Sequence, residues 1–279
     1  MTTLGIIAGG GDLPRAVAES ARKDGRDVFV ISLTGEANDW TAQFPREQVS
    51  LGEMGKTLRA LSAQKCGDVI FAGRVDRPRF ADLRLDAKGA LVAPRIAAAA
   101  LKGDDALLRA VVDVFEKEGH RVLSIAEAAP SLVVREGSIG RHRPSAEALQ
   151  DIKKGFEVVA RLGELDIGQA AAVCDGLVLA VEAAEGTDAM LARIPALPER
   201  LRGVPAKRRG VLVKAPKPIQ DRKTDLPVIG VHTIANAASA GLAGIALEAG
   251  GALIVDRDDV VRAADAANLF VIGVSPAKA

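Results

Sequence analysis

The sequence predicts an α/β protein of two domains, in which a parallel-sheet domain is followed by a distinct domain with a mixed sheet. Two observations lead to this expectation. Short apolar runs alternate with helical patterns along the first half of the chain, and in the second half an Asp-Gly pair between two apolar runs indicates an antiparallel hairpin. At 279 residues the chain is long enough for two hydrophobic cores, with a single large α/β domain as the alternative.

Strand and helix patterns alternate along the first domain, which we expect to span residues 1–133. Buried strands are expected at 4–8, 27–33, 68–72 and 121–125. Helices are expected at 13–23, 54–64 and 104–118. Because β-α-β connections within one sheet are parallel and right-handed, this alternation predicts a Rossmann-like parallel sheet.

A segment rich in glycine, proline and charge, residues 134–144, is expected to be an interdomain linker, so the second domain should span 145–279. Asp175-Gly176 between the runs 171–174 and 177–183 predicts a hairpin, and therefore a mixed sheet. Further strands are expected at 211–214, 228–231, 252–255 and 269–273. Helices are expected at 145–162, with Ser145 as the N-cap, and at 234–249.

Composition excludes several classes of function. The 37 basic and 36 acidic residues leave a net charge of +1, and aromatic residues make up 3% of the chain with no tyrosine. Both observations argue against a nucleic-acid partner, which usually meets a basic face or aromatic stacking platforms. The two cysteines, Cys66 and Cys174, are far apart and lack metal-site spacing, which indicates a reduced, cytoplasmic setting.

No apolar run is long enough to cross a bilayer. The N-terminus has no basic region before its short apolar stretch, so it is expected to be a strand and not a signal peptide. The most apolar helical stretch, 91–101, is interrupted by Pro94 and Arg95. Contact with a membrane surface remains open.

A glycine cluster lies where the first strand meets the first helix. The backbone N–H groups of Gly10, Gly11, Asp12 and Leu13 could bind an anion such as a diphosphate at the start of the helix. A tight turn with Asp12 as N-cap is the alternative. Pro14 occupies the third glycine position of the dinucleotide fingerprint, which weakens the prediction of an NAD site.

Three further residues are candidates for binding, each with a structural alternative. Arg74 follows a buried strand at its carboxyl end, where open α/β sheets place their ligands, and could instead form a surface ion pair. Asp104 begins a helix and could simply cap it. Gln169 lies in a turn before the hairpin and could bind a polar ligand, with a structural turn made by a glycine and a capping Asp166 as the alternative. The three histidines have no mutual spacing typical of a metal site or a triad.

Two segments of the second domain, 179–188 and 211–227, begin as apolar β-rich runs and end in charged clusters. This arrangement is expected where a buried strand delivers polar side chains to a site. Because carboxylates bind Mg²⁺ and cations bind phosphate oxygens, the mixture predicts a Mg²⁺-dependent phosphate site, with a salt-bridged structural loop as the alternative. The acids are Glu182, Glu185, Asp188, Asp221 and Asp225, and the cations are Lys214, Lys217 and Arg222.

Five motifs give the chain a resemblance to a known family over essentially its whole length. They are Ile6-Ile-Ala-Gly-Gly-Gly-Asp-Leu-Pro14, Lys102-Gly-Asp-Asp105, Leu165-Asp-Ile-Gly-Gln169, Val181-Glu-Ala-Ala-Glu-Gly-Thr-Asp188, and Val213-Lys-Ala-Pro-Lys-Pro-Ile-Gln-Asp221 with Asp225-Leu-Pro227. With these motifs the sequence resembles the LpxI family of Mg²⁺-dependent UDP-2,3-diacylglucosamine pyrophosphatases of lipid A biosynthesis. One departure is that Lys223-Thr224 precede Asp225, where the family pattern has an Arg-aromatic-Asp sequence.

The resemblance implies hydrolysis of UDP-2,3-diacylglucosamine to UMP and 2,3-diacylglucosamine 1-phosphate (lipid X) on the cytoplasmic side of the inner membrane, with the ligand in the interdomain cleft. Asp225 matches the acid that is key to Mg²⁺-dependent catalysis. The catalytic residues expected on this basis are Asp225, Asp221, Lys214 and Lys217, and the expected Mg²⁺ ligands are Asp225, Asp221 and Glu182, with Asp188 as the alternative to Glu182. The expected substrate contacts are Gly10, Gly11, Asp12, Leu13, Arg74, Asp104, Gln169, Glu185, Gly186, Thr187, Asp188, Gln220 and Arg222.

Two other functions remain alternatives at this point. One is an NAD-dependent oxidoreductase, and the other is a non-catalytic module that binds a nucleotide sugar. A homodimer, and peripheral contact with the inner membrane or with neighbouring enzymes of the pathway, also remain open.

Overall fold

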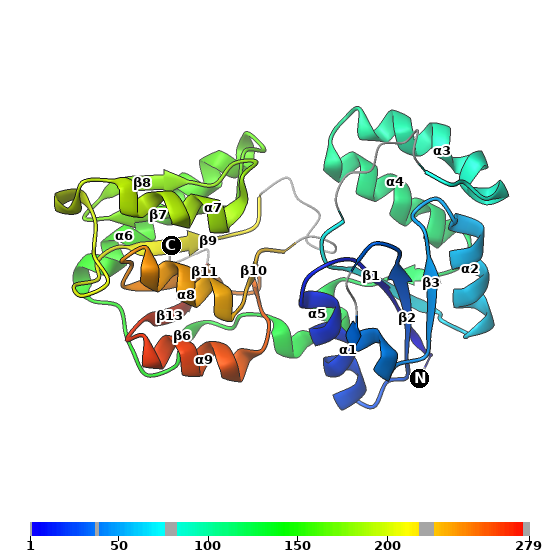
Figure 1. Cartoon of the computed structure of the whole chain (residues 1–279), viewed down its shortest axis with the longest axis horizontal. Helices are drawn as coiled ribbons and strands as arrows, with labels where there is room; N and C mark the ends of the chain where they lie inside the picture. The colour runs from blue at the N-terminus through cyan, green and yellow to red at the C-terminus, as the bar shows by residue number, and fades with distance from the viewer. Residues whose placement is uncertain (1, 37–38, 76–82, 218–225, 276–279) are drawn as a thin grey trace. The chain divides into compact units, whose positions relative to one another are not determined.

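The computed structural model describes residues 2–36, 39–75, 83–217 and 226–275, except for the side chains of Asp104 and Asp105. The chain divides into two compact units, Met1–Ser131 and Leu132–Ala279 (Figure 1). Each unit has its own sheet and its own hydrophobic core, as the sequence predicts. The expected cleft between them remains a prediction.

The first unit is built on a five-stranded sheet in the order β3-β2-β1-β4-β5, in which every neighbouring pair is parallel. The strands are β1 Leu4–Ala8, β2 Val28–Leu33, β3 Arg46–Val49, β4 Asp68–Ala72 and β5 Arg121–Val122. Five consecutive buried residues in the central β1 explain why it reads as an uninterrupted apolar run. The strand order is that of doubly wound nucleotide-binding folds, so the predicted Rossmann-like parallel sheet is confirmed.

Helices flank these strands along the chain, and the last of the helices follows β5. They are α1 Leu13–Lys23, α2 Met54–Ala63, α3 Ala87–Ala100, α4 Asp104–Lys117 and α5 Ile125–Ala128. Leu61 of α2 and Phe115 of α4 share a core with Ile31 and Val69 of the sheet, whereas α1 and α5 contact each other and the strands β1 and β4. No helix in the described part of the chain has an apolar stretch long enough to span a bilayer.

The strand expected at 121–125 is shorter than predicted. It ends at Val122, because Ser124 starts α5 through a capping box. The Ser124 hydroxyl accepts from the backbone N–H of Glu127 at 3.2 Å, and the Glu127 carboxylate accepts from the backbone N–H of Ser124 at 2.8 Å.

The second unit contains a six-stranded mixed sheet in the order β6-β13-β11-β9-β7-β8 and a two-stranded parallel sheet, β10-β12. The strands are β6 Gly137–Ile139, β7 Ala170–Cys174, β8 Leu177–Val181, β9 Val211–Lys214, β10 Val228–Ile229, β11 Gly244–Glu248, β12 Leu253–Ile254 and β13 Phe270–Val274. The strands β9, β11 and β13 are parallel, while β6 and the β7-β8 hairpin add antiparallel pairs. The predicted mixed sheet is confirmed.

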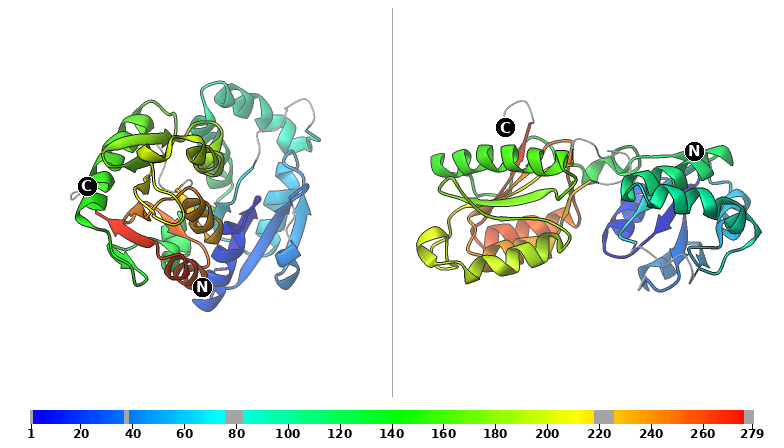
Figure 2. Two further views of the ribbon diagram at one scale, coloured as in Figure 1. Left: turned by 60° about the vertical axis from the view of Figure 1, so that its left-hand side comes forward. Right: turned by 90° about the horizontal axis from the view of Figure 1, so that it is seen from above.

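Helices cover both faces of this sheet. They are α6 Ala146–Glu164, α7 Gly186–Arg193, α8 Val231–Ser239 and α9 Arg257–Ala266. Short 3₁₀ turns lie at Ile194–Ala196 and Glu199–Leu201 in this unit, at Asp39–Gln43 in the first unit, and at Pro130–Leu132 where the two units meet in the sequence. Side chains alternate along β9, so that Val211 and Val213 pack on α6 while Leu212 packs on the opposite face with residues of α7, α8 and α9. Figure 2 shows α6 in green on one side of the strands and the other helices opposite it.

The hairpin is formed as predicted. Asp175 and Gly176 both have positive φ, 51° and 76°, which the two-residue turn between twisted antiparallel strands requires. The buried carboxylate of Asp151 on α6 accepts from both turn N–H groups, at 3.0 Å from Asp175 and 2.7 Å from Gly176. This contact fixes the hairpin against α6.

The prediction of one helix over 234–249 is wrong. The helix α8 ends at Ser239, and Gly241 with φ of 80° reverses the chain into β11, a central strand of the sheet. A Cβ atom on Gly244 would lie 2.4 Å from the Phe270 ring, so only glycine fits here. A strand that is buried on both faces has no alternating pattern, and β11 directly follows the alanine-rich segment 235–243, so the two resemble one helix in the sequence.

The segment 134–144, expected as a linker, is part of the second unit. It contains β6, which pairs with β13, and Val134 exchanges backbone hydrogen bonds with Ala252 and Gly250, each of 2.9 Å. Three residues of strand are too short to give a sequence pattern, and the glycines and charges around them dominate the composition.

Candidate active site

Polar side chains gather at one edge of the second unit's sheet. Lys214 ends β9, Glu182 directly follows β8, and Gln169 directly precedes β7. Backbone hydrogen bonds hold these strand ends together, from Glu182 N–H to the carbonyl of Ala170 at 2.9 Å and from Ala215 N–H to that of Gln169 at 3.2 Å. Strand pairing therefore places the three side chains at the same edge.

The ammonium of Lys214 is buried, with only 5% of the residue exposed. Its Nζ donates to the Thr187 hydroxyl at 3.0 Å and to the carbonyl of Val228, on β10, at 3.3 Å. Burying an ammonium costs much free energy unless its donors are satisfied, so these acceptors help to explain how the cation is kept inside.

The carboxylate of Glu182 lies at the other side of Thr187 and is also buried, with 8% of the residue exposed. Its Oε1 accepts from the Thr187 hydroxyl at 2.9 Å, and its Oε2 accepts from the backbone N–H of Gln169 at 3.4 Å. A Cβ atom on Gly168 would lie 2.1 Å from the carbonyl oxygen of Glu182, so the close approach of these segments requires glycine. We call Lys214, Thr187 and Glu182 the buried chain.

Thr187 lies in the first turn of α7, where the sequence predicts a turn at Gly186-Thr187. Gly186, with φ of 79°, begins this helix. Two acids nearby have partners elsewhere. Glu185 forms an ion pair of 3.1 Å with Arg193, and Asp188 accepts from the amide of Asn236 at 2.8 Å. The structure therefore brings Glu182 and Thr187 to Lys214 and turns these two acids to other partners.

Lys217 extends from the segment after β9 and pairs with Asp166, in the turn after α6, at 2.7 Å. The Asp166 carboxylate is more than half exposed, so the pair adds little to stability. It holds a second cation on the same stretch of chain as Lys214.

The sequence reasoning missed Glu248, a buried acid that ends β11. It follows Leu247, which pairs with Lys214 across the sheet, so Glu248 lies at the same edge as the buried chain. A Cβ atom on Gly251 would lie 2.6 Å from Glu248 Oε1. The available signal was an apolar run ending in an acid and two glycines, which the wrong helix prediction concealed.

Four predicted site residues, Gln220, Asp221, Arg222 and Asp225, lie outside the described residues. Within residues 2–36, 39–75, 83–217 and 226–275, no three histidines, cysteines or acids are grouped to hold a metal ion. The Mg²⁺ site therefore remains a prediction that depends on Asp221 and Asp225.

The glycine cluster of the first unit is packed against the end of β4. Gly10 and Arg74 exchange backbone hydrogen bonds of 2.8 and 3.0 Å, and Gly9 N–H donates to Ala72 at 2.9 Å. A Cβ atom on Gly9 would lie 2.5 Å from the carbonyl oxygen of Arg74, and one on Gly73 would lie 2.6 Å from that of Gly10. Close backbone packing thus accounts for Gly9 and Gly73, whereas a Cβ atom on Gly10 would meet the Glu36 carboxylate at 2.4 Å.

Gly11 and Asp12 are exposed just before α1. Gly11 has a φ of 89°, and the carboxylate of Asp12 makes no capping hydrogen bond in the described structure. Leu13 begins the helix and Pro14 is its second residue. Asp104 is likewise the first residue of α4, with Gly103 as the N-cap. The start of α1, with its positive end of the helix dipole, is exposed to solvent.

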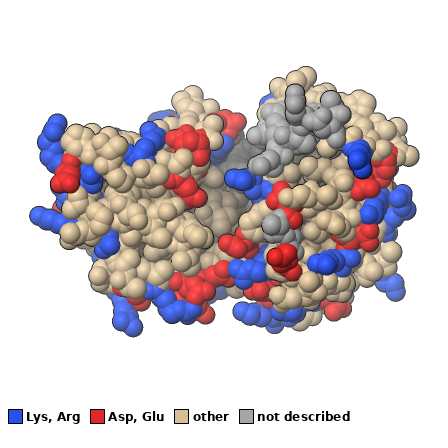
Figure 3. All heavy atoms as spheres, viewed as in Figure 1, with Lys and Arg blue, Asp and Glu red and all other residues tan. Residues whose placement is uncertain are grey.

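The cysteines and two of the histidines have structural surroundings. Burial raises the pKa of both thiols, Cys66 and Cys174, to about 11, so they are neutral at physiological pH. His120 contacts the carbonyl of Cys66 at 2.7 Å, and His142 contacts that of Asp265 at 3.3 Å. In Figure 3 acidic and basic side chains are interspersed over the visible surface of each unit.

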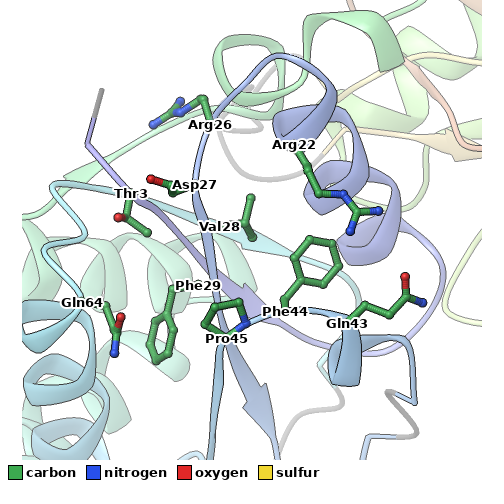
Figure 4. A pocket seen from close by; sticks show the side chains of 10 residues that line it. All are labelled: Thr3, Arg22, Arg26, Asp27, Val28, Phe29, Gln43, Phe44, Pro45 and Gln64. Atoms are coloured by element: carbon green, nitrogen blue, oxygen red, sulfur yellow. The ribbon is translucent and has the colours of Figure 1, made fainter.

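A cavity of about 370 Å³ lies in the first unit (Figure 4). The guanidinium of Arg22 lies 4.9 Å from the centre of the Phe44 ring beside it. The lining of the cavity includes Thr3, Asp27 and Val28, at the amino ends of β1 and β2. The glycine cluster, in contrast, follows the carboxyl end of β1. The cavity is therefore at the opposite edge of the sheet from the glycine cluster.

The fold and the polar edge together define a two-unit α/β protein of the kind that holds ligands at the carboxyl ends of its strands. Comparison with models of protein families assigns the chain to one family within this class. The model of the LpxI N-terminal domain matches residues 3–132, and that of the LpxI C-terminal domain matches residues 135–272. The chain belongs to the LpxI family.

The chain is 51% identical over 276 residues to a protein of Caulobacter vibrioides named UDP-2,3-diacylglucosamine pyrophosphatase LpxI, covering 99% of each chain. Among solved structures, two of N5-carboxyaminoimidazole synthetase from Staphylococcus aureus, one complexed with ADP, match 62% of this chain and 38% of the synthetase. Their identities of 16% and 18% and TM-score of 0.24 are too low to support an argument about fold or function.

Proposed function

We propose that this chain is a hydrolase that cleaves the diphosphate of UDP-2,3-diacylglucosamine in lipid A biosynthesis, giving UMP and 2,3-diacylglucosamine 1-phosphate. The observation that carries the proposal is the 51% identity to the Caulobacter pyrophosphatase over 99% of both chains. Because both units match their own LpxI domain model, the likeness is not confined to a shared nucleotide-binding fold.

The described residues suit chemistry on a diphosphate. Lys214 holds a positive charge in a buried environment at the end of β9, and Lys217 supplies another on the same stretch. A fixed charge stabilises a developing negative charge more strongly where water is excluded. In the proposal both lysines, together with Arg222, neutralise charge that develops on the leaving phosphate.

The proposed cofactor is Mg²⁺, with Asp225 and Asp221 as its protein ligands. Bound Mg²⁺ would polarise the phosphoryl oxygens and help to orient water. Because the described residues contain no group of three candidate ligands, the two aspartates outside them carry this part of the proposal. Asp225→Ala should abolish turnover and leave substrate binding largely intact.

The proposed contacts to the nucleotide are at the start of α1, where Gly11 and Asp12 are exposed. Arg74, which is hydrogen-bonded to Gly10, would bind phosphate or sugar beside them. The remaining proposed contacts are Leu13, Asp104, Gln169, Glu185, Gly186, Asp188, Gln220 and Arg222. The proposed place of action is the cytoplasmic face of the inner membrane, where the acyl chains of the substrate would be anchored.

Release of UMP from UDP-2,3-diacylglucosamine tests the proposal. UMP should appear with Mg²⁺ and stop when EDTA is added in excess, and Asp225→Ala should release none. In parallel, a thermal-shift assay should show protection by the lipid nucleotide and none by NAD. Absence of UMP with every divalent metal tried, or protection by NAD alone, would refute the proposed hydrolysis in favour of a binding module or an oxidoreductase.

A further inference from the structure

We infer that Thr187 and Glu182 are positioning residues, which fix the ammonium of Lys214 through the buried chain. In this assignment Glu182 acts through Thr187 and is not a ligand of Mg²⁺. The effect on kcat rests on the proposed hydrolysis, whereas the hydrogen bonds to Lys214 are contacts within the second unit and do not depend on it. Those contacts are the 3.0 Å and 2.9 Å hydrogen bonds on either side of the Thr187 hydroxyl.

The chemistry of the three groups fixes the direction of each hydrogen bond. An ammonium can only donate, and an ionised carboxylate can only accept. The Thr187 hydroxyl has one proton and two lone pairs, so its oxygen accepts from Lys214 and its proton goes to Glu182. A residue at this position must therefore donate and accept at one atom, which serine can also do and valine cannot.

The buried chain restrains the side chain of Lys214, which is otherwise flexible. A lysine ammonium is carried on four rotatable methylene groups, and its position in a site has to be set by its acceptors. Among the described residues, two of its acceptors come from separate elements, Thr187 on α7 and the carbonyl of Val228 on β10. Glu182 is tied in turn to the backbone of Gln169, so the restraint continues to the start of β7.

The surroundings of Glu182 favour this role over metal binding. Its Oε1 and Oε2 each accept a hydrogen bond, from Thr187 and from the Gln169 backbone. The nearest acids in the sequence, Glu185 and Asp188, contact Arg193 and Asn236. No group of three candidate metal ligands that includes Glu182 exists in the described part of the chain.

Kinetics of matched variants test the inference. Thr187→Val keeps the shape of the side chain and removes both hydrogen bonds, so kcat should fall by roughly tenfold to a hundredfold, with KM nearly unchanged. Thr187→Ser should restore most of the lost kcat. The control is Thr57→Val, because Thr57 is also buried and its hydroxyl donates to a helix carbonyl of the first unit at 3.0 Å. The control should leave both constants as they are.

A Mg²⁺ titration of Glu182→Gln separates the two roles of the acid. If Glu182 is a positioning residue, its replacement should lower kcat and leave the half-activating Mg²⁺ concentration unchanged. Loss of a metal ligand would instead raise that concentration by more than about tenfold and overturn the inference. It would also be overturned by Thr187→Val with full kcat, by Thr187→Ser no better than Thr187→Val, or by a raised KM alone.

A structure of the Thr187→Val protein keeps the inference testable if the wild-type chain releases no UMP. That result would refute the proposed function without deciding the geometry. The positioning role predicts that Lys214 Nζ leaves its place in the variant. An unchanged Lys214, still donating to the Val228 carbonyl beside an unmoved Glu182, would overturn it.

Discussion

Replacing Gly168 with alanine should separate the two segments that bring Glu182 and Gln169 together. The added Cβ atom would lie 2.1 Å from the carbonyl oxygen of Glu182 and 2.7 Å from its carbonyl carbon. Real Cβ contacts are almost never shorter than 3.0 Å, so a backbone segment must move by nearly an ångström. Because the neighbour is backbone and not a flexible side chain, the strain cannot be relieved by a change of rotamer.

The expected cost is about 2 kcal/mol, within the range for overpacked interiors. For a chain of this size, that free energy corresponds to a fall in Tm of roughly 4–8 °C. A shift of the Glu182 segment also disturbs the buried chain, so kcat for UMP release should fall with stability. The assay is thermal unfolding by circular dichroism, combined with steady-state kinetics well below the transition.

Gly67→Ala is the matched control, because the atoms nearest to its added Cβ belong to the Thr2 side chain at 3.3–3.7 Å. It should unfold within about 2 °C of the wild type, since ordinary surface substitutions change stability by about 0.5 kcal/mol or less. If Gly168→Ala unfolded at the same temperature as Gly67→Ala and kept full kcat, the close approach of Gly168 and Glu182 would not be required.

Three further predictions follow from contacts away from the buried chain. Asp151→Ala should lower the free energy of unfolding by about 2–3 kcal/mol, measured by urea denaturation, because two turn N–H groups lose a charged acceptor. Asp151→Asn should lower that free energy by less. Equal stability of the wild type and both variants would contradict this prediction. Burial alone would raise the pKa of Asp68, but hydrogen bonds from Arg121 and Arg26 outweigh burial and lower that pKa. The Asp68 carboxylate therefore stabilises the fold at pH values above its unfolded-state pKa. This contribution to stability is lost as the pH falls through the lower folded-state pKa. Asp68→Asn should therefore unfold below the wild-type Tm at pH 7 and match it at about pH 2, and a gap that stayed constant with pH would disprove the linkage. Cys66 and Cys174, whose burial raises each pKa to about 11, should react with a thiol reagent at pH 8 only as fast as the protein unfolds, and rapid labelling of the native protein would contradict their burial.

The sequence predicted those elements whose local pattern matches their final environment. Strands such as β1 and β9 are apolar runs bounded by polar or glycine-rich turns, and both end where predicted. The turn Asp175-Gly176 has the residue types that two positive φ angles demand. In these cases local chemistry and tertiary packing favour the same structure.

The misses share a physical cause, which is that tertiary contacts decide the structure. The strand β11 was predicted as helix because it directly follows the alanine-rich segment 235–243, and its identity is set by pairing with β9 and β13. The strand β6 is defined only by its partner β13. For the same reason Glu248, at the end of β11, was not recognised as part of the polar edge.

The candidate site was predictable in membership and less so in arrangement. The run from Val181 to Asp188 and the lysine that ends β9 were identified from composition and from the family motifs. That Thr187 bridges Lys214 and Glu182, while Glu185 and Asp188 contact other partners, depends on where α7 begins. Only the folded arrangement of β8, α7 and β9 determines which polar groups meet.

The central claim is that this chain cleaves the diphosphate of UDP-2,3-diacylglucosamine, and ³¹P NMR of the complete reaction tests it most directly. With Mg²⁺ present, the paired diphosphate signals should be replaced by two phosphomonoester signals, one of UMP and one of the diacylglucosamine 1-phosphate. The Asp225→Ala protein should leave the diphosphate intact. Persistence of the diphosphate with the wild-type protein, or release of UDP in place of UMP, would contradict the account.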